Sequence, residues 1–163
     1  TMFAIKPMGE AAGFRFWKPL VWWKVQFGMG YHYRACCEFI LFFEKGKRKL
    51  HDLGVPDVLE CKRIRPRKVC ECADDDCDID GEKCGNCGKW LTGTYPTEKP
   101  VPLIETLITQ SSEEGCIVAD PFMGSGSAGE AAVINGRRFI GNDKSERAVA
   151  ETLKRLARLD AAG

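Results

Sequence analysis

The sequence predicts an α/β protein with a partial, Rossmann-like parallel sheet and a small zinc-binding insert. Three observations support this fold class. The second half of the chain alternates helices with short apolar strands. A glycine-rich G-x-G-x-x-G turn joins one of those strands to the following helix. A block rich in cysteine and acidic residues, from Cys61 to Trp90, interrupts the pattern and lacks the apolar residues of a core.

The composition fits a soluble globular protein of one ordinary domain. Of the 163 residues, 44% are hydrophobic and 29% are charged, and the net charge of +1 identifies no partner. No signal peptide opens the chain, and the longest apolar run, residues 39–43, is far too short to span a bilayer. We therefore expect no membrane association and a cytoplasmic location. The nine cysteines would stay reduced there, which favours metal binding over disulfides.

Aromatic and branched residues dominate the first third of the chain. Residues 14–27 and 36–43 are predicted to form two strands joined by a glycine-bearing turn. Neither segment alternates cleanly between apolar and polar residues, so both are expected to lie in a covered sheet. Trp17, Trp22 and Trp23 are interpreted as packing residues.

The second half is predicted to fold as helix, strand, helix, strand and helix. The first helix follows from apolar residues at helical spacing, and the apolar strand 116–122 leads into the glycine turn. A small-residue face closed by a glycine marks the next helix, which precedes the strand 137–143. Ser145 is placed to cap the last helix, where Glu151 and Arg155 have the spacing of an ion pair on the polar face.

The glycine turn contains Gly124, Gly126 and Gly129, and Asp143 ends the next strand at the position of a ribose-binding acid. A turn that only packs helix against strand is the simpler alternative. Two ligand classes fit the pattern, dinucleotides such as NAD and S-adenosylmethionine. Asp120 separates them, because a carboxylate at the strand end repels a pyrophosphate but accepts hydrogen bonds from an ammonium group. The helix N terminus can receive the methionine carboxylate, so S-adenosylmethionine is the expected cofactor.

The segment around this turn closely resembles the S-adenosylmethionine-binding half of amino-group DNA methyltransferases, which make N6-methyladenine or N4-methylcytosine. Together with a looser likeness near the start, the matches cover residues 13–50 and 95–158. The order of the segments is that of the permuted group, in which the cofactor loop comes last. By this resemblance the cofactor-binding residues are Thr97, Lys99, Pro100, Asp120, Phe122, Gly124, Ser125, Gly126 and Asp143.

The resemblance also implies a division of the chain. Residues 1–60 are similar to late strands of the catalytic domain, and residues 61–92 form a cysteine-rich insert in the target-recognition region. Residues 93–163 form the S-adenosylmethionine-binding βαβα half of the methyltransferase sheet. The implied partner is double-stranded DNA, and the implied source is bacterial, archaeal or phage-encoded.

The family holds its target base with an Asp-Pro-Pro-Tyr motif or a close variant, and no such motif occurs in this chain. The strands recognised here would form the two flanks of the family sheet without its centre, which leaves unpaired edges. The chain also begins with Thr1 rather than Met. We therefore predict the C-terminal portion of a longer enzyme or one half of a split one. It would hold no catalytic residues and be inactive without the missing N-terminal half.

Three hypotheses fit the cysteine-rich block. Structural zinc is favoured, because a C-x-x-C-G knuckle and nearby cysteines can supply four thiolates. The predicted ligands are Cys72, Cys77, Cys84 and Cys87, with Cys70 as a possible substitute for either of the first two. A calcium loop is suggested by the D-x-D-x-D-G run at 76–81, but a cysteine stands where its bidentate acid belongs. A solvated acidic loop with free thiols is the third hypothesis.

A basic run beside this block offers contacts to DNA phosphates. Its residues are Lys62, Arg63, Arg65, Arg67 and Lys68. We therefore predict a zinc-stabilised, DNA-reading insert, with a merely solvated charge run as the simpler alternative. The rival function is a non-catalytic, zinc-containing nucleic-acid-binding module. A dinucleotide oxidoreductase is disfavoured by Asp120.

Overall fold

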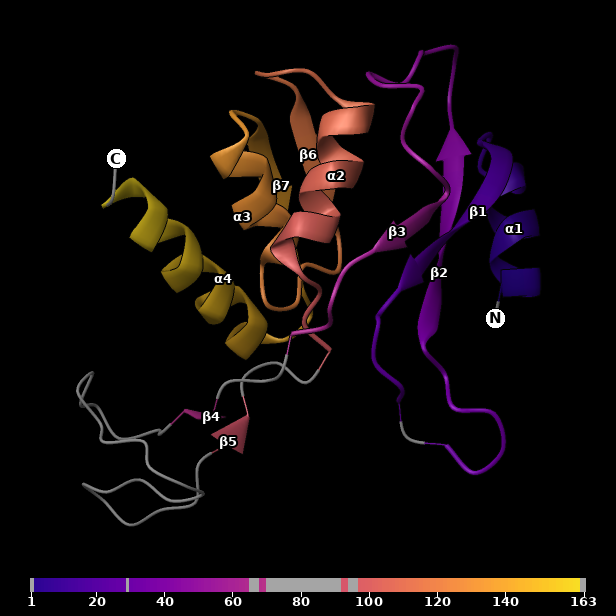
Figure 1. The fold of residues 1–163 in the computed structure, drawn as a ribbon. Helices are drawn as coiled ribbons and strands as arrows, with labels where there is room; N and C mark the ends of the chain where they lie inside the picture. The colour runs from indigo at the N-terminus through magenta and orange to yellow at the C-terminus, as the bar shows by residue number, and fades with distance from the viewer. Residues whose placement is uncertain (1, 29, 65–67, 70–91, 94–96, 162–163) are drawn as a thin grey trace.

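The computed structural model describes residues 2–28, 30–64, 68–69, 92–93 and 97–161 (Figure 1). Its first part holds helix α1 (Met2–Ala11) and strands β1 (Arg15–Trp23), β2 (Cys37–Glu44) and β3 (Val58–Glu60). The short strands β4 (Lys68–Val69) and β5 (Thr92–Gly93) follow. The last part holds α2 (Val101–Ser111), β6 (Ile117–Asp120), α3 (Ser127–Ile134), β7 (Arg138–Gly141) and α4 (Glu146–Asp160). The α/β class and the predicted order of the second half are confirmed. None of the described helices is both long and apolar enough to cross a membrane.

The first sheet has the strand order β2-β1-β3, with β2 antiparallel and β3 parallel to the central β1. The predicted pair of aromatic strands is thus confirmed, with a bulge where Phe16 and Lys18 leave the regular register. Trp22 is only 3% exposed and packs with Leu59 of β3 and Leu103 of α2. This small core fastens the first sheet to the helix that opens the second half.

The rest of this sheet is less covered than the sequence pattern predicts. Trp17 is 56% exposed, Trp23 41% and Phe39 60%, so the interpretation of all three tryptophans as packing residues holds only for Trp22. Helix α1 contacts β1 and β2, but it leaves these rings open. An apolar strand can thus mark a surface that the described part of the chain does not cover.

The second sheet is a parallel pair in which Ile117 of β6 lies opposite Arg138 of β7. This confirms the predicted β-α-β unit. Helices α2 and α3 cover one face of the pair, and the side chains that pack there are Ile108, Val118, Ala131, Ala132 and Phe139. The two alanines are 0% exposed, and their small size brings α2 and α3 together over the strands.

The other face of the second sheet is open. Ile117 is 51% exposed and Ile140 is 60% exposed. Parallel sheets are usually covered on both faces, so a covering layer is absent from the described part of the chain.

Most of the predicted insert lies outside the described residues. The predicted residues in that part are Arg65, Arg67, Cys72, Cys77, Cys84 and Cys87. The base of the insert is described, because β4 and β5 pair antiparallel with Lys68 opposite Gly93 and Val69 opposite Thr92. The residues that flank the segment 70–91 therefore lie side by side. Among the described residues, no three histidine, cysteine or acidic side chains gather as metal ligands.

Candidate functional site

A cavity of about 590 Å³ lies at the carboxyl ends of β6 and β7, a volume typical of small-molecule sites. Ligands bind at this edge of parallel α/β sheets because loops and helix N termini converge there. Seven of the nine predicted cofactor residues line the cavity: Thr97, Lys99, Asp120, Phe122, Gly124, Ser125 and Asp143. The other two do not line it. Pro100 is fully buried at the N-cap of α2, and Gly126 is the N-cap of α3.

The lining includes further residues that the motif does not single out: Ile104, Met123, Ser127, Ala128, Asn142 and Lys144. All but Ile104 lie next to motif residues in the sequence, so adjacency alone would have found them. Ile104 reaches the cavity from the first turn of α2. Besides residues 120–122 and the residues that follow β7, the lining comes from two segments that the site depends on. We call them the 97–99 wall, before α2, and the glycine turn, residues 123–127.

Each glycine of the motif has its own backbone reason. Gly124 and Gly126 have φ values of 50° and 77°, in the left-handed region that favours glycine. A Cβ at Gly129 would lie 2.9 Å from the ring of Phe139, so glycine allows α3 to approach β7 closely. Hydrogen bonds also fix the turn, for example from the Gly126 N–H to the Met123 carbonyl over 2.8 Å. The conformation of the turn is therefore fixed by its φ angles and hydrogen bonds as well as by the packing of α3 against β7.

The N terminus of α3 is open toward the cavity. Its N-cap residue, Gly126, makes no side-chain cap hydrogen bond, and Ser127 and Ala128 of the first turn line the cavity. First-turn N–H groups have no partner within their own helix, and the helix dipole adds positive potential. This end of the cavity therefore suits an anionic group.

Two carboxylates border the glycine turn. Asp120, the last residue of β6, accepts a hydrogen bond from the Phe122 N–H over 2.9 Å. Asp143 accepts one from the Ser145 N–H over 2.9 Å and one from the Gly124 N–H over 3.0 Å. These two bonds, Ser145 first, hold the pKa of Asp143 below its ordinary value. Asp143 thus ties the glycine turn to the start of α4, and a ribose contact would use the carboxylate's remaining lone pairs.

The 97–99 wall is tied to the first sheet. Lys99 Nζ donates to Glu38 Oε2 over 2.9 Å, and Lys24 Nζ pairs with Glu38 Oε1 at 2.6 Å. Both ammonium groups lie over the ring of Trp22, at 5.5 and 5.2 Å from its centroid. Partial burial raises the pKa of Glu38, but hydrogen bonds from Lys24 and Lys99 outweigh it and lower the pKa below its ordinary value. Glu38 therefore offsets part of the charge of Lys99, because one carboxylate is shared by two ammonium groups.

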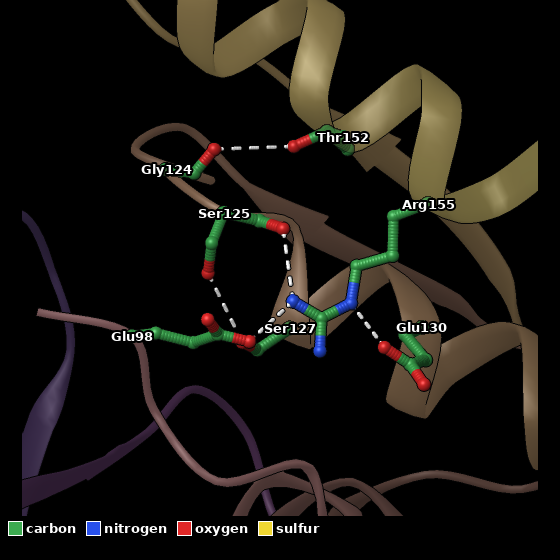
Figure 2. Close-up of polar contacts among 7 residues, drawn as sticks. All are labelled: Glu98, Gly124, Ser125, Ser127, Glu130, Thr152 and Arg155. Atoms are coloured by element: carbon green, nitrogen blue, oxygen red, sulfur yellow. Dashed lines mark hydrogen bonds and ion pairs between the residues drawn. The ribbon is translucent and has the colours of Figure 1, made fainter. Parts of the chain in front are cut away.

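A polar cluster on α4 contacts both segments (Figure 2). Arg155 Nη1 donates to Glu98 Oε1 over 2.6 Å and to the Ser125 carbonyl over 3.1 Å, and its Nε donates to Glu130. The predicted ion pair of Glu151 with Arg155 on the exposed face is therefore wrong. The Arg155 side chain is only 22% exposed, because its guanidinium is bound to two carboxylates and a carbonyl.

Thr152 belongs to the same face of α4 as Arg155, three residues earlier. It is 2% exposed, and its Oγ1 donates to the Gly124 carbonyl over 3.2 Å. No motif in the sequence identifies Thr152 or Glu98 as part of the site. A polar residue at helical spacing from buried Ala148 is the signal that could have identified Thr152.

The predicted DNA contacts are described only in part. Lys62 and Arg63 are exposed directly after β3, and Lys68 lies in β4. Exposed rings also occur on the loop between β1 and β2, where Tyr31 is 97% and Tyr33 101% exposed. The sequence pattern predicts that loop only as a turn between two strands.

Known proteins resemble this chain over most of its length. Residues 1–154 match the model of the family described as DNA methylase. The chain belongs to the N6/N4 DNA methylase family. The matched span contains all three sheets of the described residues and every residue of the cavity. It favours the methyltransferase hypothesis over the non-catalytic nucleic-acid-binding module.

Curated relatives of the methylase chain are bacterial proteins. Type II methyltransferase M2.DpnII of Streptococcus pneumoniae is 46% identical over 68 residues, which are 42% of this chain and 25% of the relative. DNA adenine methyltransferase YhdJ of Escherichia coli K12 is 42% identical over 62 residues, 38% of this chain and 21% of its own. YubD of the same strain is 34% identical over 125 residues, 77% of this chain and 43% of its own. The chain thus spans less than half the length of these relatives.

Solved structures share the fold over nearly the whole methylase chain. The complex of M1.HpyAVI with SAM has a TM-score of 0.65 and 24% identity, covering 94% of this chain and 69% of its own. The cytosine-N4-specific PvuII DNA methyltransferase has a TM-score of 0.68 and 18% identity, covering 94% of this chain and 55% of its own. At these identities the likeness establishes the α/β methyltransferase fold.

Proposed function

We propose that the chain is the S-adenosylmethionine-binding and DNA-recognition part of an enzyme that methylates an exocyclic amine of adenine or cytosine in DNA. The observation that carries the proposal is the separation of charge around the cavity. The N terminus of α3, which no side chain caps, favours an anion, whereas the carboxylate of Asp120 favours a cation. The methionine part of S-adenosylmethionine offers a carboxylate to the first and an ammonium group to the second.

The remaining lining suits the other parts of this cofactor. Asp143, whose pKa is lowered, can accept hydrogen bonds from ribose hydroxyls. Phe122 is 84% exposed at the cavity and offers an aromatic surface to the adenine. Bound S-adenosylmethionine would supply the electrophilic methyl group. The residues described here would bind the cofactor and orient it toward the amine.

Calorimetric titration of the full chain with S-adenosylmethionine and with NAD tests the proposal. We expect binding of the first and not of the second. Asp120→Asn should weaken S-adenosylmethionine binding by roughly tenfold to a hundredfold, because it removes the charge that pairs with the ammonium group. Asp52→Asn is the matched control, since Asp52 makes a similar bond, from the Gly54 N–H over 2.7 Å, outside this cavity. Binding of NAD with equal affinity would contradict the proposal.

Recognition of DNA is the second part of the proposal. The loop between β1 and β2 presents Phe27, Tyr31 and Tyr33, which are 67%, 97% and 101% exposed. Exposed rings beside cations suit stacking on unpaired bases together with phosphate contacts. The ion pair between Glu38, just after this loop, and Lys99 of the cavity brings the loop to the edge of the molecule where the cofactor would bind. The exposed basic residues after β3 extend this surface.

Methyl transfer is proposed to need protein segments in addition to those described. The open face of the second sheet, with Ile117 51% and Ile140 60% exposed, suits burial under further elements of the enzyme. The test mixes the chain with an N-terminal half that carries an Asp-Pro-Pro-Tyr-type motif, DNA and labelled S-adenosylmethionine. We expect label in the DNA from the mixture only. Turnover by residues 1–163 alone would contradict this part of the proposal.

A structural zinc ion in the insert completes the proposal. The support is the ligand spacing of the cysteines in the sequence and the pairing of β4 with β5, which holds together the residues that flank the segment 70–91. A metal would then order a segment poor in apolar residues.

A further inference from the structure

The side chain of Arg155 links three elements that are far apart in the sequence (Figure 2). From α4 it reaches Glu98 in the 97–99 wall, the Ser125 carbonyl in the glycine turn and Glu130 in α3. The side chains of Arg155, Glu98 and Glu130 are 22%, 14% and 23% exposed, so this cluster is largely shielded from water. The contribution of shielded ion pairs to stability depends more strongly on their geometry than that of exposed pairs does.

One nitrogen of Arg155 joins the two walls of the cavity. Nη1 donates both to Glu98, 2.6 Å away, and to the carbonyl of Ser125, 3.1 Å away. Glu98 lies between Thr97 and Lys99, and these two residues and Ser125 line the cavity. The planar guanidinium can serve several acceptors at fixed angles, which a single ammonium group cannot do. The contact with Glu130, by contrast, joins α4 to α3 and touches neither wall.

We infer that Arg155 is a positioning residue that holds the 97–99 wall and the glycine turn at the separation the cofactor requires. This inference rests on the proposed function, because S-adenosylmethionine is the ligand whose affinity reports the separation. Without Arg155, the 97–99 wall keeps its bond from Lys99 to Glu38 in the first sheet but loses its bond to the glycine turn. The chain would then have to order the two walls when the cofactor binds, and the affinity would fall.

Three substitutions separate this role from ordinary helix packing. Arg155→Met removes all the contacts, Glu98→Gln weakens only the bond to the wall, and Glu130→Gln weakens only the bond between α3 and α4. We expect calorimetry to show S-adenosylmethionine dissociation constants roughly tenfold higher for Arg155→Met and Glu98→Gln. The constant for Glu130→Gln should stay within about twofold of the wild type. Arg48→Met is the matched control, because Arg48 pairs with Glu113 on the surface with side chains 50% and 74% exposed.

Amide hydrogen exchange, followed by mass spectrometry without any ligand, gives a second readout. Arg155→Met and Glu98→Gln should speed exchange in peptides from both walls, and Arg48→Met should not. If the wild type binds no S-adenosylmethionine, the proposed function fails, but this exchange experiment still judges the inference. Glu98→Gln is a near-isosteric change that keeps the test valid if Arg155→Met does not fold. The inference is overturned if Glu130→Gln weakens binding as much as Glu98→Gln, or if exchange at both walls is unchanged.

Discussion

Substitution of Gly126 by alanine is expected to destabilise the fold, for two separate reasons. The residue has a φ of 77°, where an L side chain is strained. A Cβ built there would lie 2.7 Å from Thr152 Oγ1 and 2.8 Å from Thr152 Cγ2, closer than nonbonded atoms approach. Thr152 cannot easily move away, since it is 2% exposed and its Oγ1 is bound to the Gly124 carbonyl over 3.2 Å.

The size of the effect follows from these two terms. A left-handed backbone costs a residue with a Cβ about 1–2 kcal/mol. Insertion of a methyl group into a packed site costs about 1–3 kcal/mol more. Gly126→Ala should therefore lower the free energy of unfolding by about 2–5 kcal/mol. This is a large fraction of the stability of a domain of this size.

Urea unfolding of the full chain, followed by circular dichroism, measures this free energy. The control is Gly46→Ala, because Gly46 has a φ of 86° but nothing within 4 Å of its Cβ position. Gly46→Ala should lower the free energy of unfolding only by the cost of the left-handed backbone, about 1–2 kcal/mol. Thr152→Ala removes both γ atoms, so the double variant with Gly126→Ala should lose less than the sum of the single variants. If Gly126→Ala costs no more than Gly46→Ala, the contact with Thr152 does not constrain the turn.

Three further predictions concern charge and metal. The lowered pKa of Asp143 gives the fold stability that is present above the unfolded pKa of about 3.9 and is lost as the pH falls through the folded value. Asp143→Asn should therefore flatten the acid limb of a stability–pH curve, and an unchanged limb would exclude the two hydrogen bonds as its cause. Reversal of Lys62 and Arg63 to glutamate should lower the salt slope of DNA binding by about 2, measured by fluorescence anisotropy, and an unaltered slope would remove them from the interface. Elemental analysis of the purified chain should find roughly one zinc ion per chain. The double variant Cys84→Ser/Cys87→Ser should bind no zinc. Equal zinc content in the wild type and the double variant would exclude the C-x-x-C-G knuckle as part of a zinc site.

The parts of the site that the sequence predicts are those whose causes are local. The glycine turn needs its residue types because of φ angles and close approaches within one β-α-β unit, so Gly124 and Gly126 can be recognised from a few neighbouring residues. Asp120 can be recognised from local sequence in the same way, because it ends the strand that leads into the glycine turn. Helix boundaries in the second half were equally accessible, since Ser145 does accept a hydrogen bond from the Ala148 N–H as an N-cap.

The ion pairs that support the site could not be predicted, because the two residues of each pair are distant in the sequence. Arg155 and Glu98 are 57 residues apart, and Lys99 and Glu38 are 61 residues apart. Spacing within one helix favoured Glu151 as the partner of Arg155, but an exposed pair at that spacing contributes only about 0.3–0.5 kcal/mol. A shielded cluster of two carboxylates and a carbonyl outweighs it. The choice between such partners depends on the assembled fold.

The ion pair of Lys99 with Glu38, which offsets part of the lysine's charge, bears directly on which ligand the cavity takes. A lysine beside a glycine turn would ordinarily favour a phosphate, and the family resemblance identifies Lys99 only as a cofactor-binding residue. In the folded chain its ammonium group is bound to Glu38, which also holds Lys24. The positive potential in the cavity comes from the N terminus of α3 together with Lys99 and Lys144, while Asp120 and Asp143 contribute two negative charges to the lining. A pyrophosphate would be repelled by these two carboxylates, whereas a zwitterionic amino acid moiety finds a group of opposite charge for each of its own.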